Sequence, residues 1–213
     1  MSDKNAVTRK RRELANCCTL KGQQTCPDSL RHRGIVIWFT GLPTSGKSSI
    51  ASEVENRLFE RGAKTCVLDG DVMRRGISSD LGFSVEDRNE QVRRTGEIAK
   101  MFVDEGIIVL VAVISPFASQ REQVRKLFSN KDFLEVYCRC SLVECARRDT
   151  KGLYKKAKSG EIKNFTGISS PYEEPLNPDL LLDTRSQTLE ESVDAVISLL
   201  DKRKIFTKVK LMG

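Results

Sequence analysis

The 213-residue sequence lacks any apolar run long enough to span a membrane and contains only one histidine. Its longest apolar stretch, Gly106 to Ile114, is far shorter than the roughly 20 residues that a membrane helix needs. The charged N-terminus is followed by no apolar core, so we expect no secretory signal peptide. Seven scattered cysteines, an odd number, favour reduced thiols over a disulfide framework. These absences predict a cytoplasmic protein.

Zinc ligands are also scarce. Cys138 and Cys140 lie two residues apart on an expected strand, but His32 is the only histidine and no second close cysteine pair stands nearby. A structural zinc site needs about four such ligands. We therefore interpret both cysteines as core residues.

The chain carries a formal net charge of +7, which suggests an anionic partner. No aromatic residues interleave with the basic clusters, and neither zinc-finger spacing nor a ribonucleoprotein-type motif is present. Nucleic-acid binding would thus account for the net charge but for no other feature of the sequence. The basic residues gather mostly beside glycine-containing loops, which favours a small anionic substrate; the clusters are Arg9–Arg12, Arg74–Arg75, Arg93–Arg94 and residues 147–163.

Short apolar segments alternate with helical segments from Gly34 onward, and no internal repeat appears. Strands without clean polar alternation, separated by helices, indicate a parallel sheet covered on both faces. The predicted fold class is α/β, a three-layer, doubly wound parallel sheet. The expected strands are 35–40, 64–69, 107–115, 133–138 and 179–184, and the expected helices are about 47–61, 88–105, 121–128, 142–149 and 189–203.

One domain, residues 34–205, accounts for this pattern. Residues 1–33 lack sustained periodicity and are interpreted as a partly ordered N-terminal arm, and residues 206–213 as a C-terminal tail. Residues 150–178, "TKGLYKKAKSGEIKNFTGISSPYEEPLNP", break the rhythm of strands and helices. A loop of this length in a compact domain is more often a functional lid than a plain connector, so we expect a mobile lid.

A phosphate-binding loop follows the first strand. The segment "GLPTSGKS" fits G-x-x-x-x-G-K-[ST] and stands before a helix, where its backbone N–H groups and the helix N-terminus can hold phosphate oxygens. Lys47 is expected to reach the β/γ-phosphates, and the Ser48 hydroxyl to hold Mg²⁺. The expected ATP-binding residues in this loop are Gly41, Leu42, Pro43, Thr44, Ser45, Gly46, Lys47, Ser48 and Ser49.

Motors, GTPases and small-molecule kinases share such a loop, so it does not name a reaction. The GTPase motif N-K-x-D is absent, and no strand ends in the aspartate pair of a typical ATPase. The acidic feature is instead "DGD" in "VLDGDVMRR", at the end of the second strand. One of Asp69 and Asp71 can take the proton of an acceptor hydroxyl while the other organises Mg²⁺, and Arg74 can neutralise an anionic substrate.

The motifs together resemble the adenylyl-sulfate kinase (APS kinase) family of P-loop kinases over about residues 34–205. They are, in order, "WFTGLPTSGKS", "LDGDVMR", "DLGFSVEDR", "RRTGEIAK", "ISPF", "RDTKGLYKKAKSGEIKNFTGI" and "PYEEP". The resemblance implies Mg²⁺-dependent transfer of the γ-phosphoryl group of ATP to the 3′-hydroxyl of adenosine 5′-phosphosulfate (APS). The product would be 3′-phosphoadenosine 5′-phosphosulfate.

The resemblance also implies roles on the acceptor side. Asp71 is placed near the acceptor hydroxyl and Asp69 near the metal, although the reverse stays open. Phe83 would stack on the acceptor adenine, with a core role as the alternative, and Arg88 would be a second anion-binding arginine rather than a surface charge. Arg74 would neutralise the phosphosulfate.

Further contacts are expected around these residues. Ile114 and Ser115, in "ISPF", should line the crevice, with Ser115 a contact residue for direct transfer rather than a phosphorylated intermediate. Lys151 would bind acceptor or transferring phosphate, and Asn164 and Phe165 would close over the adenine opposite Phe83. Arg147 would pack against the base of ATP.

The sequence departs from the family pattern at three places. Gln91 stands where the family usually has asparagine, and Ser169 replaces the acid of "F-T-G-I-D". An insertion-like segment, "ANCCTLKGQQTCPDS", interrupts the N-terminal lead-in. Gln91 is one methylene longer than asparagine, so the geometry of its hydrogen bond to the acceptor stays open. Ser169 predicts a lid that closes less tightly.

Other functions remain as alternatives. A P-loop kinase for a nucleoside or an antibiotic would share the phosphate loop, and a regulatory module without catalysis would not need Lys47, Asp69 and Asp71 together. The resemblance favours ATP and APS as partners, without nucleic acid or membrane, and implies a homodimer. A separate ATP sulfurylase would supply APS, since 213 residues leave no room for that domain.

Overall fold

The computed structural model describes residues 31–207, so the predicted arm up to residue 30 and the tail from residue 208 lie outside the described residues. Five parallel strands form the central sheet in the order β3-β4-β2-β5-β6. Their bounds are β2 Ile35–Thr40, β3 Thr65–Asp69, β4 Ile108–Ala112, β5 Phe133–Arg139 and β6 Leu180–Asp183. The doubly wound α/β prediction is confirmed.

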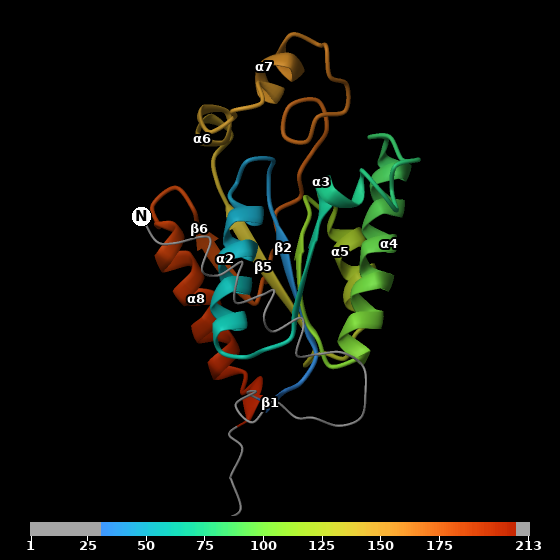
Figure 1. The fold of residues 1–213 in the computed structure, drawn as a ribbon. Helices are drawn as coiled ribbons and strands as arrows, with labels where there is room; N and C mark the ends of the chain where they lie inside the picture. Colours follow the sequence, from blue (N-terminus) through green and yellow to red (C-terminus); the bar gives the residue numbers. More distant parts are fainter. Residues whose placement is uncertain (1–30, 208–213) are drawn as a thin grey trace, which may run out of the picture.

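Helices cover both faces of the sheet (Figure 1). Alternate residues of β2 point to opposite faces: Ile37 packs in a cluster with α2 (Lys47–Glu60) and α8 (Leu189–Lys202). Trp38 packs in a second cluster with α4 (Val85–Asp104) and α5 (Ala118–Arg125). The two hydrophobic clusters, one on each face of the sheet, join the sheet to the helices and so form three layers. Because the strands are parallel, their carboxyl ends all lie at the same end of the sheet, called its carboxyl edge below.

The helix starts differ from the expected ones where side chains cap the backbone. Helix α4 begins at Val85, three residues before the expected start, because Ser84 and Asp87 form a capping box. Helix α5 begins at Ala118 rather than at residue 121 and has Gln120 at its third position. The short helix α3 (Gly70–Met73) was not expected, and the Asp69 carboxylate caps it by accepting from the backbone N–H groups of Asp71 and Val72.

Strand β4 is shorter than predicted, because the chain turns after Ala112. Ser115 has φ 39°, a left-handed conformation that is uncommon for a residue with a side chain. The apolar stretch predicted as strand 107–115 therefore ends in a turn at Ser115, which lies beside the phosphate loop because β4 and β2 are neighbours.

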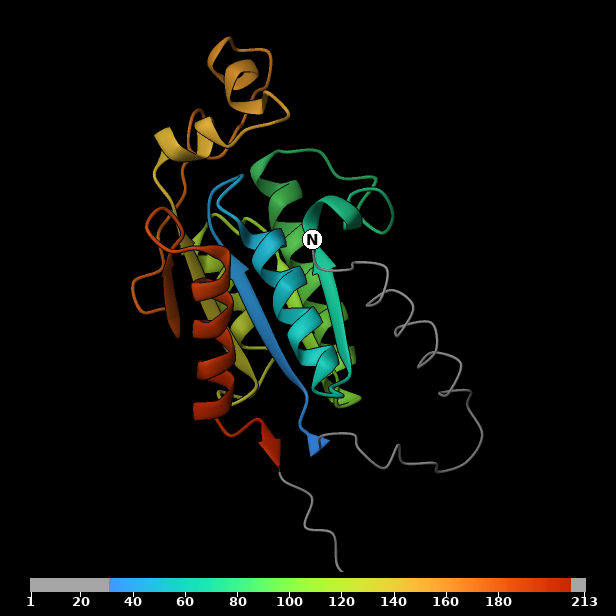
Figure 2. The same cartoon turned by 60° about the vertical axis from the view of Figure 1, so that its left-hand side comes forward.

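The expected lid segment stands above the carboxyl edge of the sheet (Figure 2). It follows α6 (Leu142–Arg147) and contains α7 (Leu153–Lys158), which was not expected. Its residues Tyr154, Ala157 and Phe165 pack with the preceding Cys140 and Cys145 in a small hydrophobic cluster, called the lid core below. At the opposite end of the molecule, β1 (Arg31–His32) pairs antiparallel with β7 (Phe206–Thr207).

Cys138 and Cys140 are buried, as predicted. Among residues 31–207, no group of three or more His, Cys, Asp or Glu side chains is arranged to hold a metal ion. No helix in this part of the chain is both long and apolar enough to cross a membrane.

Candidate active site

The phosphate loop turns tightly between β2 and α2. Gly41 and Gly46 have φ values of 150° and 96°, and Thr44 has φ 61°. Lys47, at the start of α2, donates to the carbonyl oxygens of Gly41 and Leu42 at 2.9 and 2.7 Å. Burial lowers the pKa of Lys47. The loop thus holds a buried ammonium group next to backbone N–H groups at a helix N-terminus.

Ser48 and Asp69 meet at the ends of the neighbouring elements α2 and β3. The Ser48 hydroxyl donates to Oδ2 of Asp69 at 2.5 Å. Oδ1 of the same carboxylate accepts from Asp71 N at 2.9 Å, so Asp69 both caps α3 and faces the phosphate loop. The pair of oxygen groups predicted as a metal site is therefore brought together.

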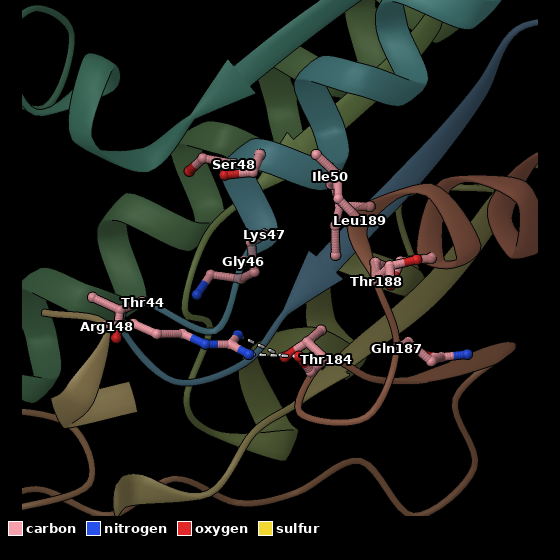
Figure 3. Close-up of a pocket in the computed structure, with 12 residues that line it drawn as sticks. Thr44, Gly46, Lys47, Ser48, Ile50, Arg148, Thr184, Gln187, Thr188 and Leu189 are labelled. Atoms are coloured by element: carbon pink, nitrogen blue, oxygen red, sulfur yellow. Dashed lines mark hydrogen bonds between the residues drawn. The ribbon is translucent and has the colours of Figure 1, made fainter. Parts of the chain in front are cut away.

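A pocket of about 520 Å³ opens beside the phosphate loop (Figure 3). It is lined by the start of α2, by Arg148 and by the segment from Thr184 to Ser192. Arg148 donates to the Thr184 carbonyl oxygen at 2.7 Å. This bond joins two parts of the pocket lining that lie far apart in the sequence. Neither Arg148 nor Thr184 was predicted from the sequence.

Arg147, the residue predicted to contact the ATP base, points elsewhere. Its side chain is 74% exposed and pairs with Glu144 at 2.8 Å within α6. It does not line the pocket beside the phosphate loop. The motif "ARRD" signalled an arginine here, but it did not tell which of the two faces the pocket.

Two guanidinium groups flank Phe83 on the acceptor side. The ring is 55% exposed, with Cζ of Arg74 at 4.4 Å and Cζ of Arg88 at 5.6 Å from its centroid. Burial lowers the pKa of Arg88, and the neighbouring charge of Arg74 lowers it further. One terminal nitrogen of Arg74 is buried without a hydrogen-bond partner. Two cations held this close, with an unused donor, have the charge and hydrogen-bonding capacity that an anion requires.

The region around "DGD" is completed by α4 and the lid. Gln91 donates to the Gly70 carbonyl oxygen at 3.1 Å. Lys151 Nζ lies 3.0 Å from Oδ2 of Asp71, in an ion pair that is largely exposed. Both predicted side chains are therefore placed directly against the "DGD" segment.

Ser115 is buried, with 2% of its surface exposed. Its hydroxyl accepts from Trp38 Nε1 at 3.1 Å and donates to Thr40 Oγ1 at 3.0 Å. The Ile114 carbonyl oxygen accepts from the Thr40 hydroxyl at 2.7 Å. The hydroxyl of Ser115 is thus engaged inside the protein beneath the carboxyl edge of the sheet.

The expected lid contacts both halves of the site. Tyr154 donates to the Pro43 carbonyl oxygen at 3.0 Å, and Arg88 donates to the Asn164 carbonyl oxygen at 2.8 Å. Phe165 is the second aromatic residue predicted for the acceptor adenine. It is buried in the lid core, where its ring lies edge-on to that of Tyr154 with centroids 4.9 Å apart.

Comparison with known proteins identifies the family. The adenylylsulphate kinase family model matches residues 33–183. The chain belongs to this family. The prediction from the sequence motifs is confirmed, and the site described above is that of an adenylyl-sulfate kinase family member.

The relatives match about four fifths of this chain. The adenylyl-sulfate kinase of Prochlorococcus marinus is 57% identical over 169 residues, which are 79% of this chain and 84% of that protein. The APS kinase of Mycobacterium tuberculosis, solved with AMPPNP and APS, has a TM-score of 0.77 and 49% identity, covering 80% of this chain and 99% of that one. A hexameric APS kinase from Thiobacillus denitrificans has a TM-score of 0.63 and 28% identity, and the match covers 83% of this chain but 30% of that one.

Proposed function

We propose that this chain transfers the γ-phosphoryl group of ATP to the 3′-hydroxyl of APS and so makes 3′-phosphoadenosine 5′-phosphosulfate. One observation carries the proposal. A pair of guanidinium groups around the exposed ring of Phe83 lies next to the "DGD" segment, whose Asp69 is bonded to Ser48 of the phosphate loop. An acceptor with a base and an anionic group fits this side, and a nucleoside triphosphate fits the other.

On the ATP side, Lys47 and the backbone N–H groups of the phosphate loop bind the β- and γ-phosphates. Lys47 exchanges its bonds to the Gly41 and Leu42 carbonyl oxygens for phosphate oxygens. The base lies in the pocket bordered by Arg148 and Thr184. Arg148 thus takes the place that the motif analysis gave to Arg147.

The oxygen donors of Ser48 and Asp69 suit Mg²⁺, which prefers hydroxyl and carboxylate ligands together with substrate phosphates and water. The two groups are already within hydrogen-bond distance. When bound, Mg²⁺ would neutralise charge that develops on the transferring phosphoryl group. This donor set is small, as is usual where the substrate supplies the remaining ligands.

On the acceptor side, Arg74 and Arg88 bind the phosphosulfate while Phe83 stacks on the adenine. Asp71 accepts the proton of the 3′-hydroxyl, because its carboxylate is exposed at the strand end and is free of the capping role that Asp69 performs. Lys151 pairs with Asp71 and also binds the γ-phosphoryl group, so that this group is aligned with the acceptor hydroxyl. Gln91 fixes the "DGD" backbone through Gly70.

Transfer is direct, with Ser115 as a contact and positioning residue. Its buried hydroxyl already donates to Thr40, so it is not presented as a nucleophile.

The segment of residues 150–178 acts as a mobile lid that excludes water during transfer. Its contacts to Pro43 and Arg88 support this role, since they reach both substrates' sides. Asn164 is linked to the acceptor site through Arg88, and Phe165, the next residue, closes over the adenine opposite Phe83.

We also propose that the enzyme acts in the cytoplasm as a homodimer of one domain spanning residues 34–205. A separate ATP sulfurylase would supply APS, because the phosphosulfate anhydride must come from a reaction that joins sulfate to an adenylate. One structural relative is described as hexameric. Sedimentation of the full chain therefore tests the dimer directly.

The decisive experiment measures ATP-dependent phosphoryl transfer to APS, with adenosine and 5′-AMP as competing acceptors. We expect strong preference for APS and loss of turnover in Asp71→Asn. Arg74→Gln and Arg88→Gln should lose the preference for APS over 5′-AMP, because only APS carries the sulfate. Preference of the wild type for another acceptor would indicate a kinase of different specificity. Absence of transfer to any acceptor would favour a regulatory module.

A further inference from the structure

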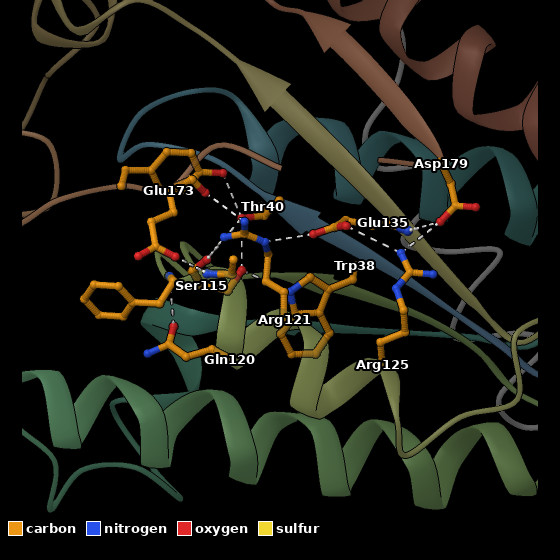
Figure 4. Close-up of polar contacts among 12 residues, drawn as sticks. Trp38, Thr40, Ser115, Gln120, Arg121, Arg125, Glu135, Glu173 and Asp179 are labelled. Carbon is orange, nitrogen blue, oxygen red and sulfur yellow. Dashed lines mark hydrogen bonds and ion pairs between the residues drawn. The ribbon is translucent and has the colours of Figure 1, made fainter. Parts of the chain in front are cut away.

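The turn at Ser115 needs outside support, because Ser115 adopts a left-handed conformation at φ 39°. Its hydroxyl is held by Trp38 and Thr40, and its carbonyl oxygen accepts from Arg121 of α5 at 2.8 Å (Figure 4). The side chain of Arg121 is only 5% exposed. A buried arginine from the helix after the turn therefore fixes its backbone.

The same guanidinium also holds the return of the lid segment. A second terminal nitrogen of Arg121 donates to the Glu173 carbonyl oxygen at 2.8 Å, and Nε lies 2.9 Å from the carboxylate of Glu135 on β5. Glu173 N donates to Pro116 O at 2.8 Å. The planar fork of one arginine thus joins the turn, the lid and the sheet, a geometry that lysine cannot reproduce.

Tyr172 makes a parallel link to the phosphate loop. Its hydroxyl lies 2.9 Å from Oγ1 of Thr40, the last residue of β2 before Gly41. The single hydroxyl proton of Thr40 goes to Ile114 O at 2.7 Å, so Tyr172 must be the donor. The ring of Tyr172 also stacks on that of Tyr137, with centroids 6.0 Å apart. The returning part of the lid segment is therefore tied to the base of the phosphate loop.

This network reaches the acceptor side through β4. Asp69 pairs with Ala112 in the sheet, and a Cβ on Gly70 would lie 3.3 Å from Cγ1 of Val113. The residues between β4 and the turn therefore pack against the "DGD" segment. A shift of the turn at Ser115 would move that packing surface.

We propose that Arg121 and Tyr172 are positioning residues that hold the turn at Ser115 and the return of the lid in register with the phosphate loop. They act through Ser115, Thr40 and Glu173. Losing either link should chiefly weaken productive binding of the acceptor, because the acceptor site lies between this turn and the lid. The kinetic part of the proposal rests on the proposed transfer to APS.

The test compares Arg121→Lys and Tyr172→Phe with Arg125→Lys. Arg125 lies on the same helix and also pairs with Glu135, at 3.4 Å, but it bonds to Asp179 rather than to the turn or the lid. It is therefore a control for loss of stability alone. For Arg121→Lys we expect KM for APS to rise about tenfold, the equivalent of one lost hydrogen bond to a charged group, and for Tyr172→Phe about fivefold, the equivalent of one lost neutral bond. KM for ATP should change less than about twofold in both.

Trp38 provides a readout that does not depend on turnover. It is the only tryptophan in the chain, and its indole N–H bonds to Ser115. Its emission should shift more in Arg121→Lys than in Arg125→Lys, whose guanidinium reaches Trp38 only through the ring of Phe133. Hydrogen exchange of residues 164–173 should accelerate in both test variants only. An unchanged KM for APS, or a rise matched by Arg125→Lys, overturns the proposal.

Failure of the proposed function would look different. Wild-type protein would then not phosphorylate APS, while the emission of Trp38 in Arg121→Lys and the exchange of residues 164–173 in both test variants would still differ from the control. If those two signals also fail to separate them, the positioning role is wrong.

Discussion

The Asp69 carboxylate performs two tasks that a single substitution can separate. It caps α3 through its backbone contacts and faces Ser48 of the phosphate loop. Asparagine caps a helix about as well as aspartate does, but it lacks the charge that a magnesium ligand needs.

We predict that Asp69→Asn leaves the unfolding free energy within about 0.5 kcal/mol of wild type, since the cap survives. The Mg²⁺ concentration at half-maximal rate should rise at least about tenfold, because an anionic oxygen ligand is lost. Urea denaturation and magnesium titration of turnover measure the two effects. Ser48→Ala should show a weaker shift of the same kind. An unchanged magnesium requirement in both variants would place the metal elsewhere.

Ser169 stands where the family pattern has an acidic residue, and in the structure its side chain accepts a hydrogen bond within the lid. Its hydroxyl accepts from the backbone N–H of Phe165 at 2.9 Å, which closes the turn around Gly167. Gly167 has φ 89°, and a Cβ there would lie 2.7 Å from Leu142. The expected loosening of the lid is therefore opposed by a local hydrogen bond that needs only an acceptor.

We predict that Ser169→Asp keeps kcat/KM for APS within about twofold of wild type, because the carboxylate can accept the same bond. Ser169→Ala removes the acceptor and should lower kcat/KM about fivefold, the equivalent of about 1 kcal/mol for one net hydrogen bond. Steady-state kinetics at saturating ATP decide the matter. Equal activity of the alanine variant would mean that the turn does not depend on this bond.

Single residues also show where sequence reasoning reaches its limit. Lys47, Ser48 and Asp69 were predictable, because a strand end followed by a glycine-rich loop or by "DGD" has a fixed direction. Arg147 and Arg148 were not separable, because α6 ends between them and a shift of one residue changes which side chain faces the pocket. The direction of Phe165 depends on packing against Tyr154, which no local pattern encodes.

At the scale of elements, the apolar runs predicted the five sheet strands, whereas side-chain caps decided where α3 and α4 begin. Short helices such as α3 and α7 have too few residues for a periodic signal, so tertiary contacts and caps determine them. Helix α4 matters most for the site, since its first two turns carry Arg88 and Gln91.

We predict that Ser84→Ala lowers the unfolding free energy by about 1 kcal/mol, the usual effect of losing an N-cap, and also raises KM for APS. Thr188→Ala is the matched control, because Thr188 forms the same capping box on α8 with Glu191. It should show a similar loss of stability with KM for APS unchanged at saturating ATP, because Thr188 borders the pocket proposed for ATP rather than the acceptor site. Denaturant unfolding and acceptor kinetics on both variants test this, and equal kinetic effects would mean that the frayed α4 start does not move Arg88.

For the molecule as a whole, the net charge of +7 suits two polyanionic substrates. Lys155, Lys156 and Lys158 all lie on α7 of the expected lid, above the strand ends where both substrates are proposed to bind. Charges so placed attract anions before contact, and salt screens that attraction over about 10 Å at 0.1 M ionic strength.

We predict that kcat/KM for APS falls several-fold between about 0.02 and 0.5 M KCl, a range over which the screening length drops from well above 10 Å to a few ångströms. A variant with Lys155, Lys156 and Lys158 changed to glutamine should start lower and depend less on salt, because the steering charges are gone. Its kcat should stay near that of wild type, since none of the three residues is placed against Asp71 or the phosphate loop. Equal salt slopes in the two proteins would assign the attraction to Arg74, Arg88 and Lys151 at the site itself rather than to the lid.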